Sequence, residues 1–524
     1  MSRVDQSPHT APLPRTGGAT GVAGRPSSPR RRWWTAFALL SLLGGLWALA
    51  GPVFSVPDEP AHAVYAAAAV RGELWAPTTG IDTTVTVPAT YANASTAAAC
   101  FIYDGTVPAG CAELFVAQPG TAEVVTTAGR YPPAYYLFAG SATLVTDGAT
   151  AIYLMRFLTV LVCAALLASA YLSVSERRSP WPLTGLVLAC TPMVLFFTAA
   201  VNPQGPELAA GIALWASALA LFPPPGPAGA PDDAASRVAP RLVLRCLAAM
   251  AALALIRPLS VVWLGLIVGV VLLSRATGRR LVALLRDRWM LLGGLAVGAM
   301  VAMTAVWVLA RDALRQWSRP VDMPVPDAAL VSVSKLDGEL AEMVGVFGWL
   351  DNAAPGLVHV LWIGAVAVLA VLAAAVGTRR ERLALVAVVA ISVVVPVVSE
   401  LSSYRESAFA WQGRYILAFS AGLTVLSGYV LADRFPDEIG RRVCRGLVVA
   451  AGLAHVVAFI GNLNRYVHGI DSFWFLGEPG WRPPLPAWLL IAAFAVVTAA
   501  AVAGLLRQLR DQRNPAPMPA VPAG

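Results

Sequence analysis

Long apolar stretches recur along this 524-residue chain and alternate with short polar or basic segments. Most of them hold roughly 16 to 23 residues, about enough for one helix to cross a hydrocarbon layer of about 30 Å. The pattern therefore predicts an all-α polytopic membrane protein with about twelve transmembrane helices. The predicted spans are residues 33–54, 150–172, 181–199, 207–222, 241–256, 258–274, 289–310, 357–377, 382–399, 415–432, 445–461 and 486–506.

Arginine clusters between these spans set the expected topology, because short cytoplasmic loops are enriched in positive charge. If the chain begins inside, the clusters within 177–178, 237–241, 275–288, 379–382, 434–445 and 507–513 all fall on the inner side. The transmembrane domain is then 33–506, between a disordered inner tail at 1–32 and a second inner tail at 507–524. The outer loops are 55–149, 311–356, 400–414 and 462–485, with a short outer turn at 200–206.

Two segments decide whether this topology holds. The apolar stretch 131–145 is short and begins Tyr131-Pro132-Pro133, so we expect an interfacial or partly inserted helix on the outer face instead of a span. Counting it as a span would move every later cluster to the outside. The stretches 241–256 and 258–274 meet at Arg257-Pro258 and form either two spans or one kinked helix.

Composition supports a membrane protein and excludes a soluble globular one, since 57% of the residues are hydrophobic and only 13% are charged. The inner arginine clusters account for the net charge of +8, so we expect no binding to nucleic acid. Frequent Ala, Arg and Pro with a single lysine, Lys335, suggest a GC-rich genome such as that of an actinobacterium. We therefore expect the bacterial plasma membrane as the location.

Six cysteines divide into two groups. Cys163, Cys190, Cys246 and Cys444 lie in or beside apolar stretches, where a free thiol behaves as a small hydrophobic side chain. Cys100 and Cys111 lie in the long outer loop, where an oxidising compartment allows them to pair. We expect that pair to form a disulfide.

The first group of residues that can carry chemistry follows the first span, in the sequence Val56-Pro57-Asp58-Glu59-Pro60-Ala61-His62. Helical spacing places Asp58, His62 and Tyr65 on one face. A carboxylate at a membrane surface can act as a general base or hold a divalent metal. The alternative is a helix N-cap whose acids complement the helix dipole.

Polar and cationic side chains recur at the other outer connections. Arg130 precedes Tyr131 and suits a phosphate, although aromatic residues at this level are also ordinary membrane anchors. Asn202 and Gln204 occupy the short outer turn, which is otherwise read as a plain turn. Arg156 and Arg257 lie within or between apolar stretches, where an ionisable group is costly and marks a functional candidate, unless it merely snorkels or pairs.

Further arginines occupy the later outer loops. If residues 311–319 are helical, Arg311, Arg315 and Arg319 share one face that binds either a carrier phosphate or anionic lipid headgroups. Arg405 and Arg414 can clamp a phosphate, whereas Arg414 and Tyr415 are alternatively interfacial anchors. We find no phosphate-binding loop, dinucleotide fingerprint, Cys/His metal spacing or nucleophile elbow, which argues against soluble nucleotide chemistry.

In this order, the motifs resemble the DUF2142 family of bacterial membrane proteins, which belongs with the GT-C glycosyltransferases. The matching features are Pro57 to His62, Tyr131 to Tyr136, Arg156, Asn202 to Gly205, Gly345 to Asp351, and Gln412 to Tyr415. The resemblance implies a GT-C bundle with interfacial helices in its first outer loop and a polyprenyl-phosphate sugar as donor. It makes Asp58 the catalytic base or a ligand of a divalent metal such as Mg or Mn, with Glu59 beside it. The second outer turn has amides where many relatives have an acid, so a metal requirement stays open.

The implied activity is transfer of a sugar to a cell-envelope glycan, lipid or protein on the outer face of the plasma membrane. The substrate-binding residues would then be His62, Tyr65, Arg130, Tyr131, Asn202, Gln204, Arg257, Arg405, Arg414 and Tyr415. Two rival functions stay open. One is a transporter or flippase of a lipid-linked envelope precursor, and the other is a non-catalytic membrane scaffold. Transporters often have internal pseudo-symmetry, and this sequence has no visible repeat.

Overall fold

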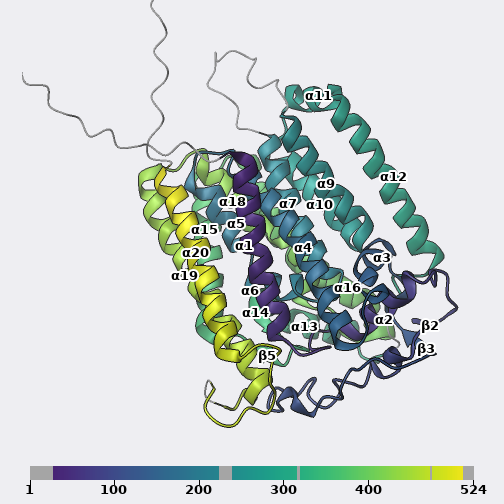
Figure 1. The fold of residues 1–524 in the computed structure, drawn as a ribbon. Helices are drawn as coiled ribbons and strands as arrows, with labels where there is room; N and C mark the ends of the chain where they lie inside the picture. Colours follow the sequence, from purple (N-terminus) through teal and green to yellow (C-terminus); the bar gives the residue numbers. More distant parts are fainter. Residues whose placement is uncertain (1–27, 223–238, 316–318, 473–474, 512–524) are drawn as a thin grey trace, which may run out of the picture.

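The computed structural model describes residues 28–222, 239–315, 319–472 and 475–511. Its long helices lie side by side along one direction, and the small strands and several short helices gather at one end of the bundle (Figure 1). Helix α11 (Gly278–Arg286) lies at the opposite end.

Seven helices of the described chain are long and apolar enough to cross a membrane. They are α1 (Pro29–Ala50), α4 (Gly148–Val174), α12 (Arg288–Ala310), α15 (Gly356–Val376), α16 (Arg379–Ser407), α19 (Asp437–His468) and α20 (Ala487–Asp511). An eighth candidate is the pair α5 (Pro180–Ala189) and α6 (Pro192–Thr198), bent by 62°. Pro192 cannot donate to the preceding helix, and the Thr191 side chain caps α6, which explains the break.

The predicted count of twelve spans is therefore not confirmed, although every predicted range falls on a helix or a broken helix. The remaining ranges fall on shorter or less apolar helices: α7 (Gln204–Leu221), α9 (Pro240–Ile256), α10 (Ser260–Arg275), α17 (Leu417–Ser420) and α18 (Gly422–Ala432). The open question at Arg257-Pro258 is resolved as two helices, because Arg257 is extended and ends α9. Helices α9 and α10 pack against each other.

Ion pairs sort the interhelical connections into two ends, as the arginine clusters predicted. At one end, Asp433 pairs with Arg177 (2.7 Å) and Arg275, and Arg275 also lies 3.4 Å from Glu381. These residues come from four connections that were expected inside. The connections expected outside meet at the other end, where Asp58 reaches Arg414.

The end expected outside carries the small elements of the fold. They comprise α2 (Glu59–Ala69), β1 (Thr78–Thr79), β2 (Asp82–Pro88), β3 (Thr121–Thr126), α3 (Ala134–Gly140), α13 (Val325–Ser334), α14 (Leu336–Gly345), β4 (Val346–Phe347) and β5 (Asn352–Ala353). Short 3-10 helices join them: η1 (Ala89–Asn93), η2 (Ala109–Cys111), η3 (Ala128–Arg130), η4 (Ser141–Leu144) and η5 (Gly413–Tyr415). The fold is helical in the bundle, and its two small antiparallel sheets, β1-β2-β3 and β4-β5, were not predicted.

The sheet β1-β2-β3 forms because β2 alternates between its two faces. Thr83, Val85 and Val87 are buried against the interior, and the residues between them face outward. Polar and apolar side chains do alternate in residues 82–88. The prediction followed the long apolar stretches on either side and did not assign a strand here. The sheet thus packs its apolar face on α2, close to the segment that carries Asp58.

Two expectations about the long outer loop are confirmed. Cys100 and Cys111 form a disulfide. The stretch 131–145 holds only the seven-residue α3 and the short η4, which pack on α2 and α4, so it is too short to span.

Some predictions lie wholly or largely outside the described residues. These are the disordered tail at 1–32 and the tail at 507–524. Where the described chain overlaps them, α1 begins at Pro29 with Ser28 as its cap, before the start of its predicted span, and α20 continues to Asp511, beyond the end of its predicted span.

Cysteine labelling tests the orientation of the two ends. Thr121→Cys on β3 and Arg286→Cys at the end of α11 are exposed positions at opposite ends of the bundle. In intact cells a membrane-impermeant maleimide should modify the cysteine at 121 and should reach the one at 286 only after permeabilisation. The reverse pattern would contradict the topology.

Candidate active site

A buried arginine fixes the start of the site. Arg156 of α4 is 1% exposed and donates from Nε and Nη2 to the two carboxylate oxygens of Glu59, at 2.8 and 2.6 Å. It also donates to the backbone oxygens of Ala48, Gly51 and Pro52. A guanidinium in an apolar interior must have such acceptors, so Arg156 ties the end of α1 to the beginning of α2.

Both carboxylate oxygens of Glu59 have hydrogen-bond partners. Its carboxylate is fully buried, and Oε1 also accepts from the backbone N–H of Val201 at 2.9 Å. A carboxylate that accepts several hydrogen bonds and pairs with a buried guanidinium is held in one position. The geometry therefore gives Glu59 a structural role beside the site.

Asp58, one residue earlier, is in a different environment. Its side chain is 51% exposed and its Oδ2 lies 3.0 Å from Nη2 of Arg414. Its backbone is left-handed, with φ 64°, and its side chain makes no capping bond to α2, so the N-cap interpretation does not hold. Such backbone strain in a residue with a side chain is typical of functional positions. The side chain of Asn202 donates to Pro57 O at 3.1 Å and fixes the preceding peptide.

Arg414 is the cationic partner in this site and is itself 2% exposed. Its Nε donates to Gln412 Oε1 at 2.5 Å, and its backbone oxygen accepts from Gln204 Nε2 at 2.6 Å. Its Nη1 is buried and has no hydrogen-bond partner within the described parts of the chain. A buried guanidinium donor without an acceptor is a ready position for an anionic ligand.

The turn that carries Arg414 rests on α14. Glu342 Oε2 accepts from the backbone N–H of Gly413 at 2.6 Å. A Cβ on Gly413 would lie 1.9 Å from the backbone oxygen of Glu339, so only glycine allows this approach. The Gln412-Gly413-Arg414-Tyr415 motif thus places the arginine through a close backbone contact.

A second arginine contacts the same aromatic ring as the first. Arg257 pairs with Glu207 at 2.6 Å, and its guanidinium carbon lies 5.7 Å from the centre of the Tyr415 ring. The Arg414 guanidinium is 5.1 Å from the same ring, so Tyr415 contacts both cations. Arg257 also lies 5.9 Å from the centre of the Tyr131 ring.

His62 completes the cluster. Its ring centre is 5.7 Å from that of Tyr131, and its Nδ1 lies 2.9 Å from the hydroxyl of Tyr136. Burial lowers the pKa of His62 to about 3, so the imidazole is neutral at physiological pH. A neutral ring adds a polar edge without adding a third positive charge.

The structure therefore brings eight predicted site residues into one region and leaves four in other roles. The eight are Asp58, His62, Tyr131, Asn202, Gln204, Arg257, Arg414 and Tyr415. Besides Glu59, the exceptions are Tyr65, Arg130 and Arg405. Tyr65 is fully buried against the ring of Tyr136, at 4.5 Å, so it faces the interior of the fold.

The two excepted arginines are occupied elsewhere. Arg130 donates to the backbone oxygens of Asp312 and Arg315, at 2.6 and 2.8 Å, and so closes the chain after α12. Arg405 is exposed and lies over the ring of Tyr404 at 5.6 Å, and in the described residues no hydrogen bond or ion pair joins it to Arg414.

The expected cationic helix after residue 310 is also absent. Helix α12 ends at Ala310 and turns at Asp312, with φ 47°, so Arg311 and Arg315 do not share a helical face. Arg311 instead donates to Ala76 O, Thr78 Oγ1 and Gly129 O.

Sequence reasoning missed three residues that shape this site. Gln412 lies inside a recognised motif and could have been found there, because its side chain accepts from Arg414. Tyr136 was grouped with interfacial anchors, and Glu342 lies in a helix with no sequence signal of function.

The donor set around Asp58 does not suit a divalent metal. Asp58 pairs with the guanidinium of Arg414, and the side chains of Asn202 and Gln204 donate to backbone oxygens. Within the described chain there is no group of three or more His, Cys, Asp or Glu side chains that could hold a metal ion. Divalent ions prefer several oxygen ligands, which this site lacks.

The fold and this cluster together define a multi-pass helical membrane protein with a polar site at one end of its bundle. Residues 40–423 match the family DUF2142, described as a predicted membrane protein, so the chain belongs to that family. Among solved structures it is similar to ArnT from Cupriavidus metallidurans bound to undecaprenyl phosphate, with 12% identity and a TM-score of 0.40. That similarity covers 92% of this chain and 77% of the other. No curated protein matches the sequence.

The structural role of Glu59 can be tested by stability. Glu59→Gln leaves Arg156 buried without its counter-charge, and breaking a buried pair on one side costs about 3–5 kcal/mol. Thermal unfolding of the purified protein should show a large loss. The matched control is Glu176→Gln, which breaks the pair with Arg245 where Glu176 is 47% exposed. That change should cost less than about 1 kcal/mol. Equal effects would contradict the assignment.

Proposed function

We propose that this protein is a glycosyltransferase that moves a sugar from a polyprenyl-phosphate donor to an acceptor of the cell envelope. The acceptor is a glycan, lipid or protein on the outer face of a bacterial plasma membrane. The single observation that carries the proposal is the half-exposed Asp58 next to the buried Arg414, whose Nη1 is without an acceptor in the described structure. In this proposal, Asp58 is the general base and Arg414 is the phosphate-binding group, and the two lie together at one end of the helical bundle.

The arginines would bind the donor. Arg414 Nη1 is placed to donate to a phosphate oxygen, and Arg257, which contacts the same Tyr415 ring, adds a second positive charge. A buried guanidinium stabilises negative charge far better than one in water, and this charge increases on the phosphate as the glycosidic bond breaks. Tyr131 and Tyr415 supply rings beside the same charges.

Asp58 would act on the acceptor. Its carboxylate accepts the proton of the attacking hydroxyl as the new bond forms between that oxygen and the anomeric carbon of the sugar. The bond from the anomeric carbon to the phosphate oxygen breaks, and its electron pair leaves with the lipid phosphate. Direct displacement inverts the anomeric centre. The donor carries its own activated phosphate, so the reaction needs no nucleotide.

Gene deletion and complementation test this proposal. Envelope glycans of a deletion strain should lack one linkage, which the wild-type gene restores. Asp58→Asn should restore little or none, because a positioned general base contributes roughly 10²–10⁴-fold. The control Glu123→Gln lies on β3 at an exposed position and should restore the linkage fully. Restoration by Asp58→Asn at normal expression would refute the catalytic assignment.

Detergent extracts separate a transferase from a flippase, because sidedness is lost once the membrane is dissolved. An extract of the deletion strain, supplied with lipid-linked donor from the same strain, should form no product until the wild-type protein is added. Product formation without this protein would make it a transporter of the precursor.

A further inference from the structure

Two aromatic side chains stand together on neighbouring loops near the candidate active site. The rings of Tyr103 and Trp349 are 5.4 Å apart at an angle of 70°. The Tyr103 side chain is 70% exposed. Neither residue was assigned a role by the reasoning from sequence or by the proposed function.

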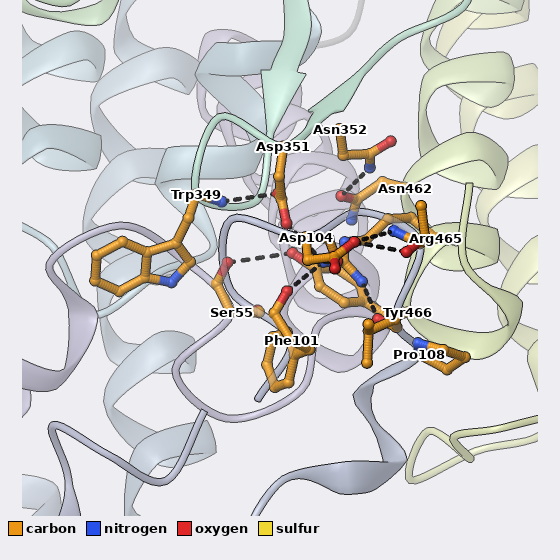
Figure 2. Close-up of polar contacts among 12 residues, drawn as sticks. Ser55, Phe101, Asp104, Pro108, Trp349, Asp351, Asn352, Asn462, Arg465 and Tyr466 are labelled. Carbon is orange, nitrogen blue, oxygen red and sulfur yellow. Dashed lines mark hydrogen bonds and ion pairs between the residues drawn. The ribbon is translucent and has the colours of Figure 1, made fainter. Parts of the chain in front are cut away.

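The loop that carries Tyr103 is held by one buried cation. Arg465 of α19 is fully buried, and its Nη2 donates to the backbone oxygens of Phe101 and Asp104, at 2.6 and 2.9 Å. Its Nη1 donates to Val107 O at 2.7 Å. These acceptors flank Tyr103 on both sides, and the Cys100–Cys111 disulfide closes the same loop. Figure 2 shows these loop oxygens gathered around the arginine.

The same cation holds the loop of Trp349. Asp351 Oδ2 accepts from Arg465 Nη2 at 2.6 Å, and its Oδ1 accepts from the backbone N–H of Trp349 at 3.0 Å (Figure 2). Gly348 has φ 62°, and a Cβ there would lie 2.0 Å from Asp351 Oδ1. One Arg465–Asp351 pair therefore fixes both aromatic residues relative to each other.

Backbone strain marks the exposed ring as a fixed element. Tyr103 has φ 63°, a left-handed conformation that is costly for a residue with a side chain. A Cβ on Gly105 would lie 2.5 Å from the backbone oxygen of Asp351, so the two loops touch through their backbones. Strain of this kind persists only where the surroundings enforce it, as the buried pair does here.

This aromatic pair is connected to the segment that leads to Asp58. Trp349 Nε1 donates to Phe54 O at 3.1 Å, and Tyr466 donates to Ser55 O at 3.2 Å, so both hold the segment that leads to Asp58. Partial desolvation of its hydroxyl and then the charge of Asp58 raise the pKa of Tyr103, which agrees with this proximity. Ordinary membrane anchors have no such connection to an active-site carboxylate.

We propose that Tyr103 and Trp349 form a platform that binds a sugar ring of the acceptor and presents its hydroxyl to Asp58. A pyranose or furanose has an apolar face of C–H groups and a polar rim. An exposed aromatic ring on a rigid support can stack on that face while the rim stays hydrated. The inference rests on the proposed function and narrows the acceptor to a saccharide.

The test uses glycans released from the envelope of the deletion strain, which keep their acceptor positions unfilled. Transfer by the full-length protein is measured at increasing glycan concentration, with lipid-linked donor extracted from the same strain. In Tyr103→Ala the glycan concentration for half-maximal rate should rise about tenfold, corresponding to about 1.4 kcal/mol of lost stacking. The donor concentration for half-maximal rate should not change. Tyr103→Phe should bring the glycan dependence back to within about twofold, because it keeps the ring.

The control is Trp75→Ala. Trp75 is also an exposed aromatic residue of the first outer loop, at 62% exposure. Its ring lies next to α12, 4.7 Å from the ring of Trp307. The Trp75→Ala change should leave the glycan and donor concentrations for half-maximal rate unchanged. An unchanged glycan dependence in Tyr103→Ala, or an equal rise in the donor dependence, would overturn the platform.

Binding measured without turnover separates this proposal from the proposed function. The same glycans are added to the Asp58→Asn protein in lipid nanodiscs, and saturation transfer to their ring protons is recorded by NMR. The signal should be strong, and Tyr103→Ala in the same background should remove most of it. Absent transfer by the wild-type protein refutes the proposed function, whereas transfer with a signal that Tyr103→Ala leaves intact refutes only the platform.

Discussion

The buried pair of Arg156 and Glu59 is the interaction on which the candidate site depends. A guanidinium in the apolar interior would be prohibitively costly without acceptors, and here the required acceptors are a carboxylate and three backbone oxygens where α1 ends and α2 begins. Satisfying Arg156 therefore fixes the path of residues 51–59. Arg257, Arg414 and Arg465 apply the same constraint to other connections of this end of the bundle.

This constraint gives two adjacent acids different properties. Glu59 is fully buried, and both of its carboxylate oxygens have partners. Asp58 is half exposed and pairs with Arg414 through one oxygen. The left-handed backbone of Asp58 turns its side chain away from the buried pair. The acidic dipeptide thus supplies one buried anchor, Glu59, and one accessible carboxylate, Asp58, and the anchor determines where the accessible carboxylate lies.

The sequence predicted the placement of helices and the sorting of their connections, because hydrophobic length and arginine position act locally. The count of twelve spans is not confirmed, and the sequence pattern did not show that the range 181–199 divides into α5 and α6 with a bend of 62°. Motif residues such as Asp58 and Arg414 converge as the family resemblance implied. Arg130 does not join them, because the fold determines which acceptors an arginine can reach. Its guanidinium donates to the backbone oxygens of Asp312 and Arg315, just after α12 ends.

A structure of the full-length protein with bound polyprenyl-phosphate sugar would test the central claim most directly. The account predicts a phosphate oxygen within about 3 Å of Arg414 Nη1, with the anomeric carbon turned toward Asp58. A phosphate bound away from Arg414, or a sugar whose anomeric carbon is out of reach of any hydroxyl held by Asp58, would contradict it.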